Sequence, residues 1–199
     1  MKFVIRKVPE RNTLYLERLL PKDQTIIVSD IEHRGPLWSM NKAFSDANDD
    51  AIYIQDDMLL CPRFVERTQE YIEKYQDDVI VFANNTAEGN PMVDHEGFYG
   101  IRTIKWLMCT YVPDKIAKAY LYELKMGIWK PSEHDVKYRL DDNVFTKWMA
   151  SKDMLGFLTV PNLAGHPQNK STINGWKHPE VCTNFDYAHA EKRLVGEEQ

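Results

Sequence analysis

The stretch Ala51-Ile52-Tyr53-Ile54-Gln55-Asp56-Asp57 decides the fold, because a short apolar strand runs directly into two acidic residues. A short, continuous apolar run of this kind is typical of a strand buried on both faces, as in a parallel sheet covered by helices. The two acids then lie in a loop at the carboxyl end of the strand, which is where open α/β sheets bind ligands.

Apolar strands and segments of helical period alternate on both sides of this stretch. We predict strands at 3–5, 25–28, 79–83 and 155–160, and helices at 12–20, 37–47 and 64–75, with one more after Pro113 and another capped by Asp142. Residues 88–106 break the alternation with Gly, Pro, His and aromatic residues. We therefore interpret them as an insertion or as an acceptor-side loop, that is, a loop on the side where a second substrate would bind.

This alternation predicts one α/β domain over residues 1–175, with a mostly parallel central sheet and flanking helices. Residues 176–199 are expected to form a C-terminal extension that packs on or near the active site.

The composition is that of a globular protein, with 43% hydrophobic residues, 12% aromatic residues and a net charge of -5 over 199 residues. The negative charge argues against a protein that coats nucleic acid non-specifically. No stretch approaches the roughly 18 apolar residues of a membrane span, and the N-terminus becomes polar too early for a signal peptide. Cys61, Cys109 and Cys182 lack metal or disulfide spacing, so we expect a cytoplasmic protein, in the host cytoplasm if it is viral.

The acidic pair Asp56-Asp57 is a candidate metal site. Adjacent carboxylates repel each other, and a cation beside them relieves that repulsion. Mg²⁺ and Mn²⁺ prefer carboxylate oxygens and keep positions open for phosphate oxygens. The alternative is a solvated turn before Pro62.

A second acidic pair, Asp141-Asp142, stands at the start of a predicted helix. A carboxylate held there could accept a proton from an attacking hydroxyl. The alternative is ordinary helix capping and complementarity to the helix dipole.

A third polar cluster follows the last predicted strand and contains His166 and Lys170. No Asp or Glu occurs over residues 154–179, although the whole chain is rich in acids. Such a stretch tolerates an anionic diphosphate. The alternative is that His166 is a structural or surface histidine.

Together the three clusters resemble the GT-A fold glycosyltransferases, including small phage-type, lipopolysaccharide-type and family-2-like members, over about residues 1–175. Gln55-Asp56-Asp57 resembles the strand-end metal motif of that family, Asp141-Asp142 its acidic pair and His166 its C-terminal histidine. The closest local similarity to lipopolysaccharide-type members is Pro161-Asn162-Leu163-Ala164-Gly165-His166 followed by Ser171-Thr172-Ile173. The chain departs from the family at Gln55, where an acid is usual, and at Met40-Asn41, where many members carry Arg-Asn.

The resemblance implies a metal-dependent hexosyl- or pentosyltransferase that moves a sugar from a nucleotide diphosphate, UDP being the first expectation, to an acceptor hydroxyl. It implies that Asp57 and His166 bind Mn²⁺ or Mg²⁺ and that Asp142 is the catalytic base of an inverting transfer, with retention as the alternative. Asp141 would orient the acceptor or cap its helix. The residues expected to bind the donor are Lys7, Arg11, Asp30, Arg34, Trp38, Asp56 and Lys170.

The acceptor is predicted by analogy with virus-encoded glycosyltransferases that modify hydroxymethylated bases in duplex DNA. An aromatic side chain with nearby cations can stack a flipped base and hold phosphate, and the C-terminal extension carries Trp176, Lys177, His178, Lys192 and Arg193. The alternatives are a solvated tail and a saccharide or lipopolysaccharide acceptor.

Other classes of protein fit the sequence less well. A nucleotidyltransferase would carry a glycine-rich phosphate loop after the first strand, and residues 6–11 contain no glycine. The motifs of zinc deaminases and zinc proteases are also missing. A non-catalytic nucleotide-binding protein of the same fold is the remaining alternative.

Overall fold

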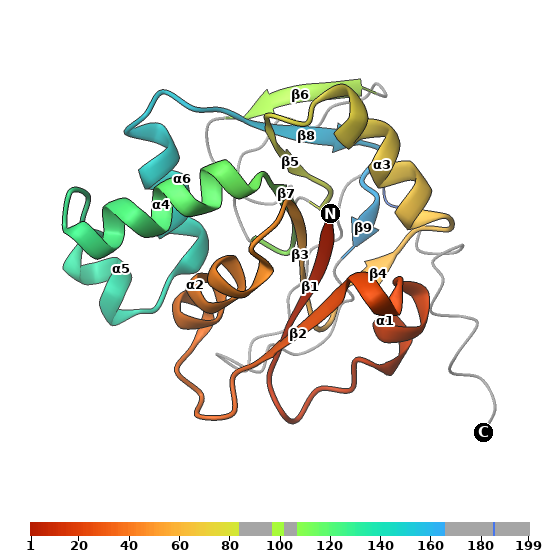
Figure 1. Cartoon of the computed structure of the whole chain (residues 1–199), viewed down its shortest axis with the longest axis horizontal. Helices are drawn as coiled ribbons and strands as arrows, with labels where there is room; N and C mark the ends of the chain where they lie inside the picture. Colours follow the sequence, from red (N-terminus) through yellow and green to blue (C-terminus); the bar gives the residue numbers. More distant parts are fainter. Residues whose placement is uncertain (84–96, 102–106, 166–184, 186–199) are drawn as a thin grey trace.

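The protein is represented by a computed structural model, which describes residues 1–83, 97–101, 107–165 and 185 (Figure 1). The described elements are β1 (Lys2–Lys7), α1 (Leu14–Leu19), η1 (Lys22–Gln24), β2 (Thr25–Ser29), α2 (Pro36–Ala47), β3 (Ala51–Gln55), β4 (Leu59–Leu60), α3 (Phe64–Lys74), β5 (Val79–Val81), β6 (Gly97–Ile101), β7 (Cys109–Val112), α4 (Asp114–Met126), α5 (Glu133–Lys137), α6 (Asp141–Ala150), β8 (Gly156–Val160) and β9 (Ala164–Gly165).

The described strands form a seven-stranded sheet in the order β2-β1-β3-β7-β5-β8-β6, together with a small β4-β9 pair. β1 pairs in parallel with β2 and β3, and β5 pairs in parallel with β8. β7 runs antiparallel to both β3 and β5, and β6 runs antiparallel to β8. The prediction of an α/β sheet with flanking helices is therefore confirmed, and the sheet is mixed, with three parallel and three antiparallel strand pairings.

The three neighbouring strands β2, β1 and β3 end at the same edge of the sheet. Lys7 of β1 lies opposite Ser29 of β2, and Arg6 lies opposite Gln55 of β3. The residues that follow these strands are therefore brought side by side, although they come from separate parts of the chain.

Helices cover both faces of the sheet, with α2, α4 and α6 on one side and α1 and α3 on the other (Figure 1). On the first face, the ring of Phe44 lies 4.7 Å from that of Tyr53 and 5.2 Å from that of Phe145, centroid to centroid. The side chains of β1 are buried on both faces, with Val4 in one core and Phe3 in the other. This two-sided burial explains the continuous apolar runs of the central strands.

Two details of the predicted secondary structure are wrong. Residues 97–101 lie within the segment interpreted as an insertion or an acceptor-side loop. They form β6, which pairs with β8 from Gly97 opposite Val160 to Ile101 opposite Gly156, so the loop alternative is wrong for these residues. The glycines in this segment obscure the alternation that would mark a strand. The remaining parts of the predicted segment, 88–96 and 102–106, lie outside the described residues.

The second error concerns α6, which begins at Asp141 and has Leu140 as its N-cap residue, without a side-chain cap. Asp142 therefore lies inside the first turn and does not cap the helix. Among the described helices, none has the length and apolar character needed to cross a bilayer.

Candidate active site

Asp56, which follows β3, fastens the loop after β1. Its Oδ2 accepts a hydrogen bond of 2.9 Å from the backbone amide of Val8. Burial raises the pKa of Asp56 above its ordinary value of 3.8, and the charge of Asp57 raises it too. The Val8 hydrogen bond and the guanidinium groups of Arg11 and Arg6 act in the opposite direction. Asp56 is therefore a partly desolvated carboxylate, with the negative charge of Asp57 and the positive charges of Arg11 and Arg6 nearby.

Asp57 forms an ion pair with Arg11, whose Nη1 lies 2.8 Å from Asp57 Oδ2. Both side chains are largely withdrawn from solvent, at 18% and 10% exposed for Arg11 and Asp57. Charges in such surroundings interact more strongly than they do in water. Arg11 thus supplies a positive charge beside the acidic pair.

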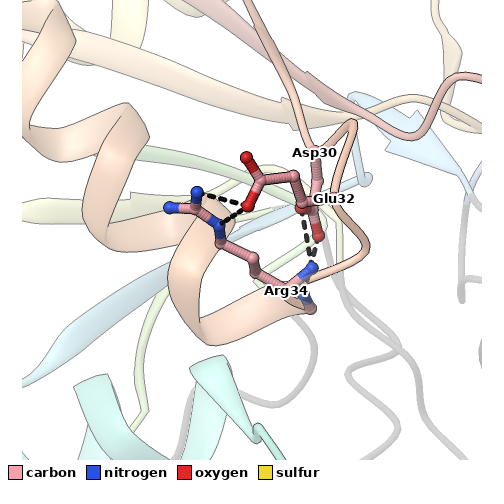
Figure 2. A network of polar contacts seen from close by, with 4 residues as sticks. Asp30, Glu32 and Arg34 are labelled. Carbon is pink, nitrogen blue, oxygen red and sulfur yellow. Dashed lines mark hydrogen bonds and ion pairs between the residues drawn. The ribbon is translucent and has the colours of Figure 1, made fainter.

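Asp30, which follows β2, is buried and bound by main-chain amides. Its Oδ1 accepts from the backbone amide of Arg34 at 2.8 Å, and its Oδ2 accepts from that of Gly35 at 2.6 Å (Figure 2). The amide of Asp30 in turn donates to Lys7 O at 2.9 Å. Asp30 therefore shapes the turn that leads from β2 into α2.

Gly35 has a φ of +98°, and a Cβ built at this position would lie 2.5 Å from Cδ of Arg139. Both the backbone conformation and the contact require glycine. Arg139 itself is fixed by a hydrogen bond of 2.7 Å from its Nη1 to His33 O. A glycine turn therefore precedes α2, with an arginine from a distant segment lying over it.

The Arg34 side chain leaves this turn toward solvent. Its Nε lies 2.8 Å from Oε2 of Glu32 (Figure 2), and its Cζ lies 4.8 Å from the ring centroid of Trp38. Lys7, another predicted donor-binding residue, donates from Nζ to Thr13 Oγ1 at 3.3 Å. Lys7, Arg34 and Trp38 thus all lie in or beside the segments that follow β1 and β2.

Asp141 is brought to the end of β1 by a buried ion pair. Nη1 of Arg6 lies 2.7 Å from Asp141 Oδ2, and Nη2 of Arg6 donates to Leu107 O at 2.8 Å. Arg6 lies opposite Gln55, the residue before Asp56. Asp141, predicted at a helix start, is therefore anchored to the end of β1, the strand that lies beside β3. Asp142 follows Asp141 in the first turn of α6 and is partly buried.

The segment before His166 returns to the strand that follows Asp57. Gly165 of β9 lies opposite Leu59 of β4, and the amide of Cys61 donates to Leu163 O at 2.9 Å. His166 and Lys170 lie outside the described residues, as do Trp176, Lys177, His178, Lys192 and Arg193. Phe185 is buried, and its ring packs on Gly165.

The described residues contain no group of three or more His, Cys, Asp and Glu side chains arranged to hold a metal ion. The predicted ligand set combines a carboxylate of Asp57 with the imidazole of His166, and this donor chemistry fits Mn²⁺ or Mg²⁺ with positions open for phosphate oxygens.

Sequence reasoning did not identify the contacts of Arg6 and Arg139. The signal for Arg6 was a charged residue directly after the apolar Phe3-Val4-Ile5 run, a place where a buried charge needs a partner. Arg139 carried no comparable signal, because its contact with Gly35 depends on tertiary packing. Comparisons of the sequence with protein-family models and with curated proteins found no match.

Proposed function

We propose that this chain is a metal-dependent glycosyltransferase of the GT-A type, which transfers a sugar from a nucleotide diphosphate to an acceptor hydroxyl. The observation that carries the proposal is that Arg6 at the end of β1 binds Asp141 and lies opposite Gln55, the residue before Asp56 and Asp57. The acidic pair Asp56-Asp57 follows β3, and the Arg6 ion pair holds Asp141 at the end of the neighbouring β1. The edge at which these strands end is where α/β sheets bind nucleotides.

Asp57 and His166 are the proposed metal ligands. The pairing of Gly165 with Leu59 supports this proposal, because it keeps the residue before His166 close to the segment that follows Asp57. A bound Mn²⁺ or Mg²⁺ would act as a Lewis acid toward the departing diphosphate. Lys170 would add positive charge there.

The donor nucleotide would lie over the ends of β1 and β2. Arg11, Lys7 and Arg34 provide positive charge in this region, and Trp38 provides an aromatic surface. Asp56 and Asp30 each accept main-chain hydrogen bonds, and a carboxylate oxygen has a second lone pair that a ribose hydroxyl can use. Both carboxylates hold the loops that follow β1 and β2 in shape, and their contact with the ribose is a prediction.

Asp142 is the proposed catalytic base. Because the carboxylate of Asp141 is bound to Arg6, we assign proton acceptance to Asp142 and a structural role to Asp141. In this mechanism Asp142 takes the proton of the acceptor hydroxyl as its oxygen attacks the anomeric carbon. The sugar–phosphate bond breaks on the opposite side, which inverts the anomeric centre.

The proposed acceptor is a hydroxymethylated base in duplex DNA, with a saccharide as the alternative. The aromatic and basic residues of the C-terminal extension that favour DNA are known from the sequence and lie outside the described part of the chain. Binding to duplex DNA should weaken steeply with salt if cations of the extension track phosphates. A flat salt response would favour the saccharide acceptor.

The proposal is tested by incubating the chain with a panel of nucleotide sugars and measuring diphosphate release with Mn²⁺, with Mg²⁺ and with EDTA. We expect metal-dependent release with one donor class, and a loss of about 100-fold or more in kcat for Asp142→Asn. Asp57→Ala should lose activity and respond less to metal. The control is Asp77→Asn, which removes an exposed carboxylate paired with Lys115 and should leave activity unchanged. Near-full transfer by Asp57→Ala or Asp142→Asn would refute the assigned roles.

A further inference from the structure

The ion pair between Arg6 and Asp141 joins two segments that are 135 residues apart in the chain. Arg6 is 6% exposed and Asp141 is 7% exposed, so both charges are removed from water. The second guanidinium nitrogen of Arg6 donates to Leu107 O, just before β7. Arg6 therefore connects the end of β1, the first turn of α6 and the segment entering β7.

Stability alone does not account for this arrangement. Removing two charges from water is expensive, and apolar residues of similar volume often replace a buried ion pair without loss of stability. Strand β1 places apolar side chains at its preceding positions, Phe3, Val4 and Ile5, so an apolar residue would suit the end of the strand as well. Unlike apolar packing, the ion pair is directional, so it fixes the position of the Asp141 carboxylate relative to the Arg6 guanidinium.

Lysine could not take over this role in full. Arginine presents its donors in a rigid planar fork, whereas the lysine ammonium is a single point on a flexible stem. The two acceptors of Arg6 belong to different segments, the carboxylate of Asp141 and the carbonyl of Leu107. Holding both at once uses the geometry of the fork.

We propose that Arg6 is a positioning residue of the active site, which fixes Asp141 and thereby sets where the first turn of α6 presents Asp142. This inference rests on the proposed function, in which Asp142 accepts the acceptor proton. It divides the acidic pair into one carboxylate that anchors the helix and one that acts on substrate.

A second ion pair on α6, between an exposed lysine and a buried aspartate, provides a control on the same helix. Lys147, near the other end of the helix, donates to Oδ2 of Asp135 at 2.7 Å, and Asp135 is 1% exposed in its side chain. This pair fastens α6 to α5 without touching the proposed site. Removing it measures what a loosened α6 does to catalysis when the Asp141 end is intact.

The kinetic experiment compares the double variants Arg6→Met/Asp141→Leu and Lys147→Met/Asp135→Leu. Because whole pairs are replaced by apolar side chains, both variants should fold. We expect the first to lose about 10- to 100-fold in kcat, as misplaced catalytic groups do, with the donor KM changed by less than about threefold. The control should keep kcat within about twofold. A first variant with wild-type kcat, or a control that loses as much, would overturn the proposal.

The same change in an Asp142→Asn background tests whether Arg6 acts through Asp142. Groups that act as a unit are non-additive, so Arg6→Met/Asp141→Leu should cause no further loss of kcat there. An additive loss would mean that the pair acts by another route. If the double variant does not fold, Arg6→Lys takes its place: it keeps the charge, and we expect an intermediate kcat with an unchanged donor KM.

Amide hydrogen exchange separates a failure of this inference from a failure of the proposed function. Loss of the Arg6 pair should speed exchange in the first turns of α6, at Phe145 and Thr146, by about tenfold or more relative to the control. This readout needs no activity. If the wild-type chain transfers no sugar, the proposed function fails while exchange still tests the anchor. If activity is present and exchange is unchanged, the anchor is wrong.

Discussion

At the scale of single residues, the turn before α2 depends on glycine. Gly35 combines a φ of +98° with a close approach to Arg139, and both features disfavour a side chain at this position. Gly100 of β6 offers a comparison, because a Cβ there would lie 3.6 Å from Leu155, an ordinary contact. Two glycines of the same chain therefore carry different constraints.

We predict that Gly35→Ala lowers the free energy of unfolding by about 1–3 kcal/mol, because alanine must adopt a backbone conformation that only glycine enters readily. Gly100→Ala should change the free energy of unfolding by less than about 1 kcal/mol. Urea denaturation of both variants measures the difference. Equal stabilities would show that the turn adapts and that Arg139 moves away.

Asp56 makes stability depend on pH in a direction opposite to that of most carboxylates. Its pKa in the folded chain lies above the ordinary value of 3.8, so the folded chain holds its proton more tightly than the unfolded chain does. The contribution of Asp56 to stability therefore falls as pH rises from 3.8 through the folded pKa. At neutral pH the ionised Asp56 therefore stabilises the fold less than its protonated form would.

We predict that Asp56→Asn is at least as stable as the wild type near neutral pH and less active as a transferase. Asparagine keeps an oxygen for the Val8 amide and removes the charge whose burial is unfavourable. The stability advantage of the variant should shrink as pH falls toward 4. Urea denaturation across this pH range measures it, and an advantage that grows on acidification would contradict the sign.

At the scale of secondary-structure elements, β9 joins the end of the described chain to the loop after β3. Phe185 lies over Gly165 and is 7% exposed, so it belongs to the core that contains α1 and α3. One residue of the C-terminal extension is thus anchored beside the strand that leads to His166.

We predict that Phe185→Ala lowers the free energy of unfolding by about 3–5 kcal/mol, because it removes a buried ring and leaves a cavity. Leu14 of α1 is 53% exposed, so Leu14→Ala should lower the free energy of unfolding by less than about 1 kcal/mol. Chemical denaturation compares the two variants. A Phe185→Ala protein as stable as Leu14→Ala would mean that the ring contributes little to the fold.

Sequence periodicity predicted the elements whose apolar residues form clear patterns. The strands at 3–5 and 25–28, and the helix after Pro113, correspond to β1, β2 and α4. It missed the β4-β9 pair, because two-residue strands carry no period, and it missed α5 for the same reason. The position of the acids after β3 could be predicted from the local sequence. The ion pair between Asp141 and Arg6 could not, because it joins residues 135 apart and depends on the topology of the sheet.

At the scale of the whole molecule, a nucleotide and a metal ion that bind only the folded chain must stabilise it. We predict that UDP with Mn²⁺ raises Tm by about 5–10 °C when both are near 100 times their Kd. UDP with EDTA should raise Tm much less, and Asp57→Ala should abolish the difference. Thermal denaturation with each nucleoside diphosphate in turn measures these shifts. Equal shifts with and without metal would refute the metal-dependent site.

The reversed strand β7 also has a consequence for synthesis on the ribosome. It lies between β3 and β5, so the blocks β2-β1-β3 and β5-β8 meet only through residues 109–112. A nascent chain that has emerged only as far as β5 lacks β7, so the edges of β3 and β5 that face β7 stay uncovered until residue 112 has emerged. These two strand edges are therefore paired late in synthesis, and unpaired apolar edges in a partly made chain are prone to aggregate.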